Sequence, residues 1–126
     1  MKGITYDTGA LIAAEKGDRR FWAMHYWAAA TKEYPTVPAG VLAEAWRGSK
    51  SAQIARVLKT CRIEDLTEEQ AQKVGTLIGK SGLNDPVDVT VAEGAMRRGD
   101  SVVTSNRAHM EQIAHAAGKQ LNILDV

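Results

Sequence analysis

The sequence has little cysteine and no long apolar run. Cys61 is the only cysteine among 126 residues, which excludes an internal disulfide and a multi-cysteine zinc site. A lone thiol suits a reducing compartment, so we expect a cytoplasmic protein. No apolar run approaches the roughly 20 residues of a membrane span. We expect no signal peptide, because Lys2 is soon followed by polar Thr5 and Asp7, and we expect no membrane partner.

The sequence also has no large excess of positive or negative charge. The formal net charge is +1, so no overall field favours nucleic acid or a membrane surface, and local patches would have to provide such contacts. Apolar residues make up 44% of the chain and charged residues 25%, with no visible repeat or linker. We expect one globular domain spanning residues 1–126.

Short apolar stretches alternate with helical patterns along the chain. Thr67 and Gln70 form a capping box, Asp85-Pro86 starts a helix, and Gly79 and Gly99 mark helix ends. The alternation predicts an α/β fold with a mostly parallel sheet covered by helices on both faces. Strands are expected at residues 3–6, 34–37, 61–65 (a charged edge strand), 101–104 and 121–124, and helices at 8–16, 19–32, 39–47, 51–59, 68–78, 86–98 and 107–117.

The expected helix at 19–32 carries large side chains on every side. One interpretation is a helix buried between neighbouring elements. The other is a protein–protein surface, because Trp and Tyr are enriched in interfaces. The bulky residues are Phe21, Trp22, Met24, Tyr26 and Trp27.

Acidic or amide side chains occur where strands should lead into helices. They are Asp7, Glu44, Asp88 and Asn106. In an open α/β sheet these junctions face one edge, where ligands bind. Carboxylates gathered there would suit a hard divalent cation.

Each of these residues also has a purely structural interpretation. Asp7, Asn106 and Asp85 can each cap the helix that follows, and Asp88 can favour a helix start through its charge. Glu44 lies beyond the first turn of its helix, so its alternative is a solvated helix face.

The order of these motifs resembles PIN-domain ribonucleases, and most closely the small VapC-type toxins. The resemblance covers residues 4–124, and it is carried by residues 6–12, 41–44, 85–92 and 102–106. It implies a three-layer α/β/α sandwich with a central sheet of about five strands. It also implies an endoribonuclease that uses Mg²⁺ or Mn²⁺ to cleave single-stranded regions of RNA.

The resemblance assigns roles to individual residues. Asp7, Glu44 and Asp88 match the first three acids of the family, and Asn106 stands where many members have a fourth. We expect Asp7 and Asp88 to ligate the metal and Glu44 to hold water around it or a second ion. Asn106 lowers the negative charge of the site by one, which would weaken binding of a second metal.

Further residues are expected to support this site. Thr8 and Ser105 would supply hydroxyls, Asp85 would act mainly as a cap, and cationic side chains would contact RNA. The cations expected at the edge are Arg47, Lys50 and Arg107; the histidines His25, His109 and His115 show no zinc spacing and are left out of the site.

The resemblance also implies partners. These are a small antitoxin that inserts a helix into an apolar groove, formed in part by the helix at 19–32, and a second copy of the chain. The alternative is a PIN-like binding module with weak catalysis, which Asn106 keeps open. Asp7-Thr8-Gly9 matches the aspartic protease tripeptide, but that fold is all-β, and Gly9 argues against a haloacid dehalogenase-type phosphatase.

Overall fold

The computed structural model describes residues 3–126, which form one sheet with helices on both faces. Every strand pairing in this part of the chain is parallel, in the order β3-β2-β1-β4-β5. The predicted mostly parallel sheet of about five strands is therefore confirmed. The strands are Ile4–Tyr6 (β1), Thr36–Pro38 (β2), Arg62–Glu64 (β3), Ser101–Thr104 (β4) and Ile123–Asp125 (β5).

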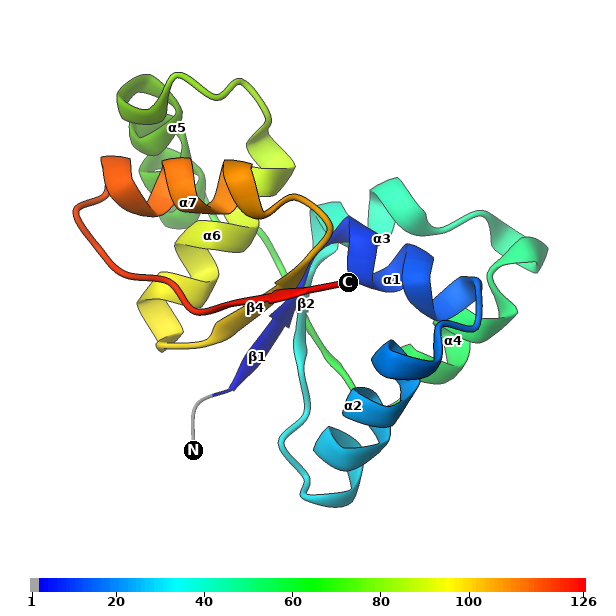
Figure 1. Cartoon of the computed structure of the whole chain (residues 1–126). Coiled ribbons are helices and arrows are strands. Elements are labelled where there is room, and N and C mark those ends of the chain that lie inside the picture. Colours follow the sequence, from blue (N-terminus) through cyan, green and yellow to red (C-terminus); the bar gives the residue numbers. More distant parts are fainter. Residues whose placement is uncertain (1–2) are drawn as a thin grey trace.

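Helices form the two outer layers. Figure 1 shows α1 to α4 on one side of the sheet and α5 to α7 on the other, so the three-layer prediction is confirmed. Within residues 3–126, no helix has the length and apolar character needed to cross a membrane. The helices are Thr8–Glu15 (α1), Arg19–Ala30 (α2), Ala39–Ala45 (α3), Ala52–Leu58 (α4), Glu68–Ser81 (α5), Pro86–Arg98 (α6) and Arg107–Ala116 (α7), with a short 3₁₀ turn at Gly48–Lys50 (η1).

The core lies on both faces of the central strands. β4 pairs with β1 and with β5, and its Val102 and Val103 are buried, as expected for a strand covered on both faces. Tyr6, Leu11 and Phe21 belong to the same apolar cluster. The charged strand β3 lies at an edge of the sheet, as predicted.

The strand order changes direction beside β1. From β1 the chain adds β2 and then β3 on one side, and it later returns to place β4 on the other side of β1. Such a switch point leaves a crevice at the carboxyl ends of the strands, which is the usual ligand site of open α/β sheets. Asp7 follows β1 at this point, and Ser105 and Asn106 follow β4.

Helix α5 is longer than predicted. Gly79 lies inside the helix, and the chain leaves it at Gly82, which has a φ of 75° in the left-handed region. A glycine inside a helix costs about 1 kcal/mol relative to alanine. Burial of Val74 on this helix and partial burial of Leu77 oppose that cost, so the helix continues past Gly79.

The capping box at the start of α5 is only half formed. The Thr67 hydroxyl accepts the backbone N–H of Gln70 at 3.1 Å, as predicted. The Gln70 side chain does not reach back, however, and instead donates to Glu93 Oε1 of α6 at 2.9 Å. The buried Glu93 carboxylate requires hydrogen-bond donors, and the Gln70 amide supplies one of them in place of the expected capping contact.

Helix α2 is buried on one face only, so the interpretation of a helix enclosed by neighbours is wrong. Phe21, His25 and Ala28 are buried, whereas Tyr26 and Trp27 are 54% and 52% exposed. The interpretation of this helix as an interaction surface stays a prediction.

Candidate metal site at the strand ends

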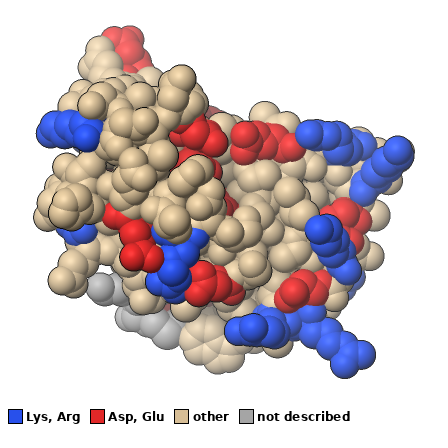
Figure 2. All heavy atoms as spheres, turned by 45° about the horizontal axis from the view of Figure 1, so that its top comes forward, with Lys and Arg blue, Asp and Glu red and all other residues tan. Residues whose placement is uncertain are grey.

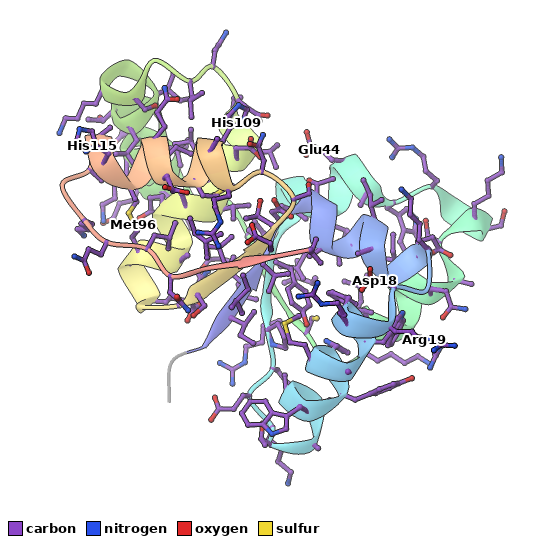
Figure 3. All side chains as sticks on the ribbon, in the orientation of Figure 1. Asp18, Arg19, Glu44, Met96, His109 and His115 are labelled. Carbon is purple, nitrogen blue, oxygen red and sulfur yellow. The ribbon has the colours of Figure 1, made fainter. Side chains whose placement is uncertain are left out.

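The predicted site residues lie at the carboxyl ends of β1 and β4 and on the neighbouring helices. Asp7 and Asn106 follow those two strands, Glu44 belongs to α3, and Asp88 belongs to α6. Figure 3 shows Glu44 and His109 at the same end of the molecule, on α3 and α7 respectively.

Asp7 is both a helix cap and a buried acid. Its Oδ1 accepts the backbone N–H of Ala10 at 3.0 Å, which caps α1, and its Oδ2 accepts the Thr104 hydroxyl across the β1–β4 junction. Its side chain is almost fully buried. Burial raises the pKa of Asp7, the two hydrogen bonds oppose that change, and the negative charge of Asp88 raises the pKa further.

Asp88 does not cap a helix. The cap of α6 is Asp85, whose Oδ1 accepts the N–H groups of Val87 at 3.1 Å and of Asp88 itself at 3.2 Å. The expected capping role of Asp85 is therefore confirmed. The carboxylate of Asp88 is left for other contacts, and its Oδ2 lies 2.9 Å from Nδ1 of His109.

Asn106 connects the two strand ends to α7. Its Oδ1 accepts the N–H of His109 at 3.3 Å and caps α7, and its Nδ2 lies 2.7 Å from His109 Nδ1. Its own N–H donates to Thr104 Oγ1 at 2.8 Å. Thr104 therefore links Asn106 to Asp7 on the other side of the switch point.

His109 is a residue of this site that zinc-type spacing in the sequence does not reveal. It contacts both Asp88 and Asn106 although it is 21 residues from the first. The available signal was its place three residues after the Asn106 cap, on the first turn of α7. That signal becomes meaningful only when α6 and α7 are known to pack together.

Glu44 is the exposed member of the set. It lies in the last turn of the seven-residue helix α3, where a negative charge is unfavourable to the helix dipole. Its Oε1 accepts the Thr8 hydroxyl at 2.5 Å, which ties it to the residue after Asp7. Helix stability therefore does not explain a carboxylate at this position.

The acids approach one another without forming a closed cage. Within residues 3–126, no group of three or more His, Cys, Asp or Glu side chains is placed to hold a metal ion. Asp7 and Asp88 are close enough for one charge to act on the other, and Asp88 also contacts His109.

The donor set nevertheless fits a hard divalent cation. In the described part of the chain, no Lys or Arg forms an ion pair with Asp7, Glu44 or Asp88. A buried carboxylate beside a second negative charge is relieved by a cation. Mg²⁺ keeps several waters and commonly uses only one or two protein carboxylates, so it does not require a closed cage.

The three expected cations differ in how firmly other groups hold them. Arg107 donates to Asp125 Oδ1 at 3.0 Å and Oδ2 at 2.9 Å, so its guanidinium is held against β5. Arg47 is exposed and donates to the Trp46 carbonyl at 2.6 Å. Lys50 is exposed on η1.

Positive charge is concentrated in the segment after Glu44. Residues 45–63 contain no Asp or Glu. Figure 2 shows Lys and Arg most densely toward the right of this face, with others at its left and centre, and Asp and Glu across the middle and between them. The cations of this segment are Arg47, Lys50, Arg56, Lys59 and Arg62.

Comparison with known proteins identifies the fold. No family model and no curated protein matches the sequence. The DNA-bound VapBC2 structure from Rickettsia felis is 16% identical, covers 98% of both chains and has a TM-score of 0.75. DNA-bound VapBC from Salmonella typhimurium is 18% identical over 99% of this chain and 98% of that one, with a TM-score of 0.71. PAE2754 from Pyrobaculum aerophilum is 18% identical over 99% and 84%, with a TM-score of 0.67. The predicted PIN-like three-layer fold is thus confirmed.

Proposed function

We propose that this chain, which has the fold of the VapBC toxin structures, is a metal-dependent endoribonuclease that cleaves single-stranded regions of RNA. The observation that carries the proposal is the placement of Asp7 and Asp88. Asp7 follows β1 at the switch point of the sheet, Asp88 contacts His109 on the first turn after β4, and the negative charge of Asp88 raises the pKa of Asp7. Cytoplasmic RNA is the substrate class that we assign.

Asp7 and Asp88 would hold Mg²⁺ or Mn²⁺. The bound cation would lower the pKa of water and neutralise charge on the phosphate. Thr104 and the N–H of Ala10 fix the Asp7 carboxylate, so its position is set before substrate arrives. Glu44, held by Thr8, would orient water on the open side.

RNA would approach over the basic segment after Glu44. Arg47 and Lys50 are exposed there, and both are without an ion-pair partner among residues 3–126. Such side chains contact phosphates irrespective of sequence. Arg107 is assigned a lesser part, because Asp125 already holds it.

The first test is cleavage of single-stranded RNA by the purified protein with Mg²⁺ or Mn²⁺. Asp7→Asn and Asp88→Asn should each lower the cleavage rate about 10²–10³-fold, as is typical when one group that stabilises transition-state charge is removed. The control is Glu69→Gln, which removes an exposed carboxylate on α5. This variant should cleave at the wild-type rate.

Two results would contradict the proposal. One is RNA cleavage that chelation of divalent metal leaves unchanged. The other is a wild-type rate no higher than that of Asp7→Asn with either metal. Thermal melts of every variant without metal would separate loss of fold from loss of chemistry.

We further propose that the protein is the toxin of a toxin–antitoxin pair and forms a homodimer. The support is the fold shared with two VapBC structures and the exposed aromatic side chains Tyr26 and Trp27 on α2. A small DNA-binding protein encoded next to this gene should copurify with the chain. Light scattering of the chain alone would test the dimer.

Two observations favour a different function. Asn106 stands in the place of a fourth acid and serves as the cap of α7, and no cage of three acids is formed in the described chain. A PIN-like module that binds RNA or protein with weak catalysis would have these features. It would bind single-stranded RNA without metal-stimulated cleavage.

A further inference from the structure

The imidazole of His109 lies at the edge of the proposed metal site without an assigned role. Its Nδ1 is 2.9 Å from Asp88 Oδ2 and 2.7 Å from Asn106 Nδ2. The side chain of His109 is 39% exposed and that of Asp88 is 17% exposed. A carboxylate, an imidazole and an amide therefore meet where solvent can still reach them.

Hydrogen bonds cannot satisfy all three groups together. Nδ1 carries either one proton or one lone pair. With a proton it can donate to Asp88 but faces the NH₂ group of Asn106, and with a lone pair it can accept from Asn106 but faces a carboxylate oxygen. The Asn106 amide is also not free to turn, because its Oδ1 caps α7 through the N–H of His109.

The spacing of these atoms matches the ligand shell of a small cation. Two ligands at about 2.1 Å from an octahedral ion and at right angles to each other lie about 3.0 Å apart. The separation of Asp88 Oδ2 and His109 Nδ1 is 2.9 Å. The separation therefore suits two neighbouring ligands of one ion, which would replace the present contact between the two side chains.

We propose that His109 is a nitrogen ligand of the metal site and that the site therefore prefers Mn²⁺ to Mg²⁺. This inference rests on the proposed function, because Asp88, one of the two carboxylates assigned to the metal there, would share the ion with His109. Mg²⁺ favours oxygen ligands and keeps its waters. Mn²⁺ is also suited by carboxylates and water and is the weakest binder of the first-row series, but as a transition metal it accepts an imidazole nitrogen more readily than Mg²⁺ does. Asn106 stands where many members of the resembled family have a fourth acid, so the site lacks one possible metal ligand. His109 would supply a neutral ligand in its place.

The other histidines make this assignment testable. The chain has three. His25 is buried. Its Nδ1 lies 2.7 Å from Tyr6 Oη, and its Nε2 lies 2.7 Å from Thr60 Oγ1. His115 is exposed in the last turn of α7, the same helix as His109, and serves as the matched control.

The experiment is pulsed electron paramagnetic resonance of Mn²⁺ bound to the full chain, with calorimetric titration of Mn²⁺ and Mg²⁺. Wild-type protein and His115→Gln should show nitrogen coupled to Mn²⁺, and His109→Gln should not. The affinity of His109→Gln for Mn²⁺ should fall at least about 10-fold, since even residues that only support a metal ligand are worth about 10–100-fold, with a much smaller change for Mg²⁺.

The outcomes separate this inference from the proposed function. Saturable Mn²⁺ binding that is lost in Asp88→Asn but shows no nitrogen coupling in wild-type protein overturns the role of His109 alone. Absence of saturable Mn²⁺ binding overturns both. If His109→Gln melts at a lower temperature without metal, the wild-type spectrum and that of His115→Gln still decide the question.

Discussion

At the scale of single residues, two side chains in this site combine a structural role with a place in the candidate metal site. Asp7 caps α1 and also supplies a buried carboxylate, and Asn106 caps α7 while its amide meets His109. The structural and functional interpretations of Asp7 and Asn106 are therefore not alternatives. Capping holds each head group in place, and the remaining donor or acceptor faces the switch point.

Gly9 illustrates how closely the site is packed. A Cβ built on Gly9 would collide with the Ser105 hydroxyl and lie 3.1 Å from the backbone nitrogen of Ser105. This contact brings the start of α1 against the turn after β4. Ser105 therefore acts here through packing, and its predicted role as a supporting hydroxyl stays a prediction.

We predict opposite effects for alanine at two glycines. Gly9→Ala should lower the stability of the fold by about 1–3 kcal/mol, because the turn at Ser105 must move. Gly79→Ala should raise it by about 0.5–1 kcal/mol, because Gly79 lies inside α5 with no atom within 4 Å of the added methyl group. Urea unfolding of both variants is the measurement. Equal stability of Gly9→Ala and wild type would contradict the packing argument.

At the scale of elements, α2 shows most clearly how a helix divides its faces. Phe21, His25 and Ala28 pack into the core, and Trp22 lies at the boundary under the guanidinium of Arg56, 4.7 Å from its ring. Tyr26 Oη also accepts a hydrogen bond from Arg56 at 2.9 Å. Helices α2 and α4 thus present Trp, Tyr and Arg together, the residue types that dominate binding energy in protein interfaces.

We predict that Trp27→Ala weakens binding of the small antitoxin proposed above about 30-fold, as expected for loss of a hot-spot side chain worth about 2 kcal/mol. The melting temperature should hardly change, because the side chain is 52% exposed. Tyr34→Ala is the matched control, since Tyr34 is an exposed aromatic residue outside α2. Isothermal titration with the copurified partner is the measurement. Equal affinities of Trp27→Ala and Tyr34→Ala would place the partner elsewhere.

At the scale of the whole molecule, a buried polar chain joins β1, α2 and the end of α4. The Thr60 hydroxyl donates to the Val57 carbonyl at 3.3 Å, so its oxygen accepts from Nε2 of His25. Nδ1 of His25 then accepts the hydroxyl proton of Tyr6. Burial lowers the pKa of His25 and raises the pKa of Tyr6, which keeps both groups neutral. Burial likewise raises the pKa of Cys61 to about 12, so this thiol is unreactive at neutral pH.

We predict a loss of stability in acid that depends on His25. Because the folded-state pKa of His25 lies below its unfolded value of about 6.5, the unfolded chain binds more protons once the pH falls below that value. The stability that neutral, buried His25 contributes to the fold is fully present above that pH and is lost below it. The free energy of unfolding changes there by at most about 1.4 kcal/mol per pH unit. Urea unfolding between pH 7.5 and 5.5 should show a shallower pH dependence in His25→Gln. An equal slope in both proteins would assign the effect to other groups.

The sequence by itself determined the order and type of the elements. Caps at Asp85 and Thr67 and the apolar run of β4 are local signals, and local signals are readable because they depend on neighbours in the chain. The helix end at Gly79 was misjudged because a tertiary contact outweighs the intrinsic cost of glycine.

Only the tertiary structure decided which side chains meet at the strand ends. The contacts of Asp88 with His109 and of Glu44 with Thr8 span 21 and 36 residues. They depend on how α6 packs against α7 and α1 against α3. No periodicity or cap reports that packing, because it is set by the whole sheet and its two helical layers. The sequence therefore identified the acids, and the fold added the imidazole beside them.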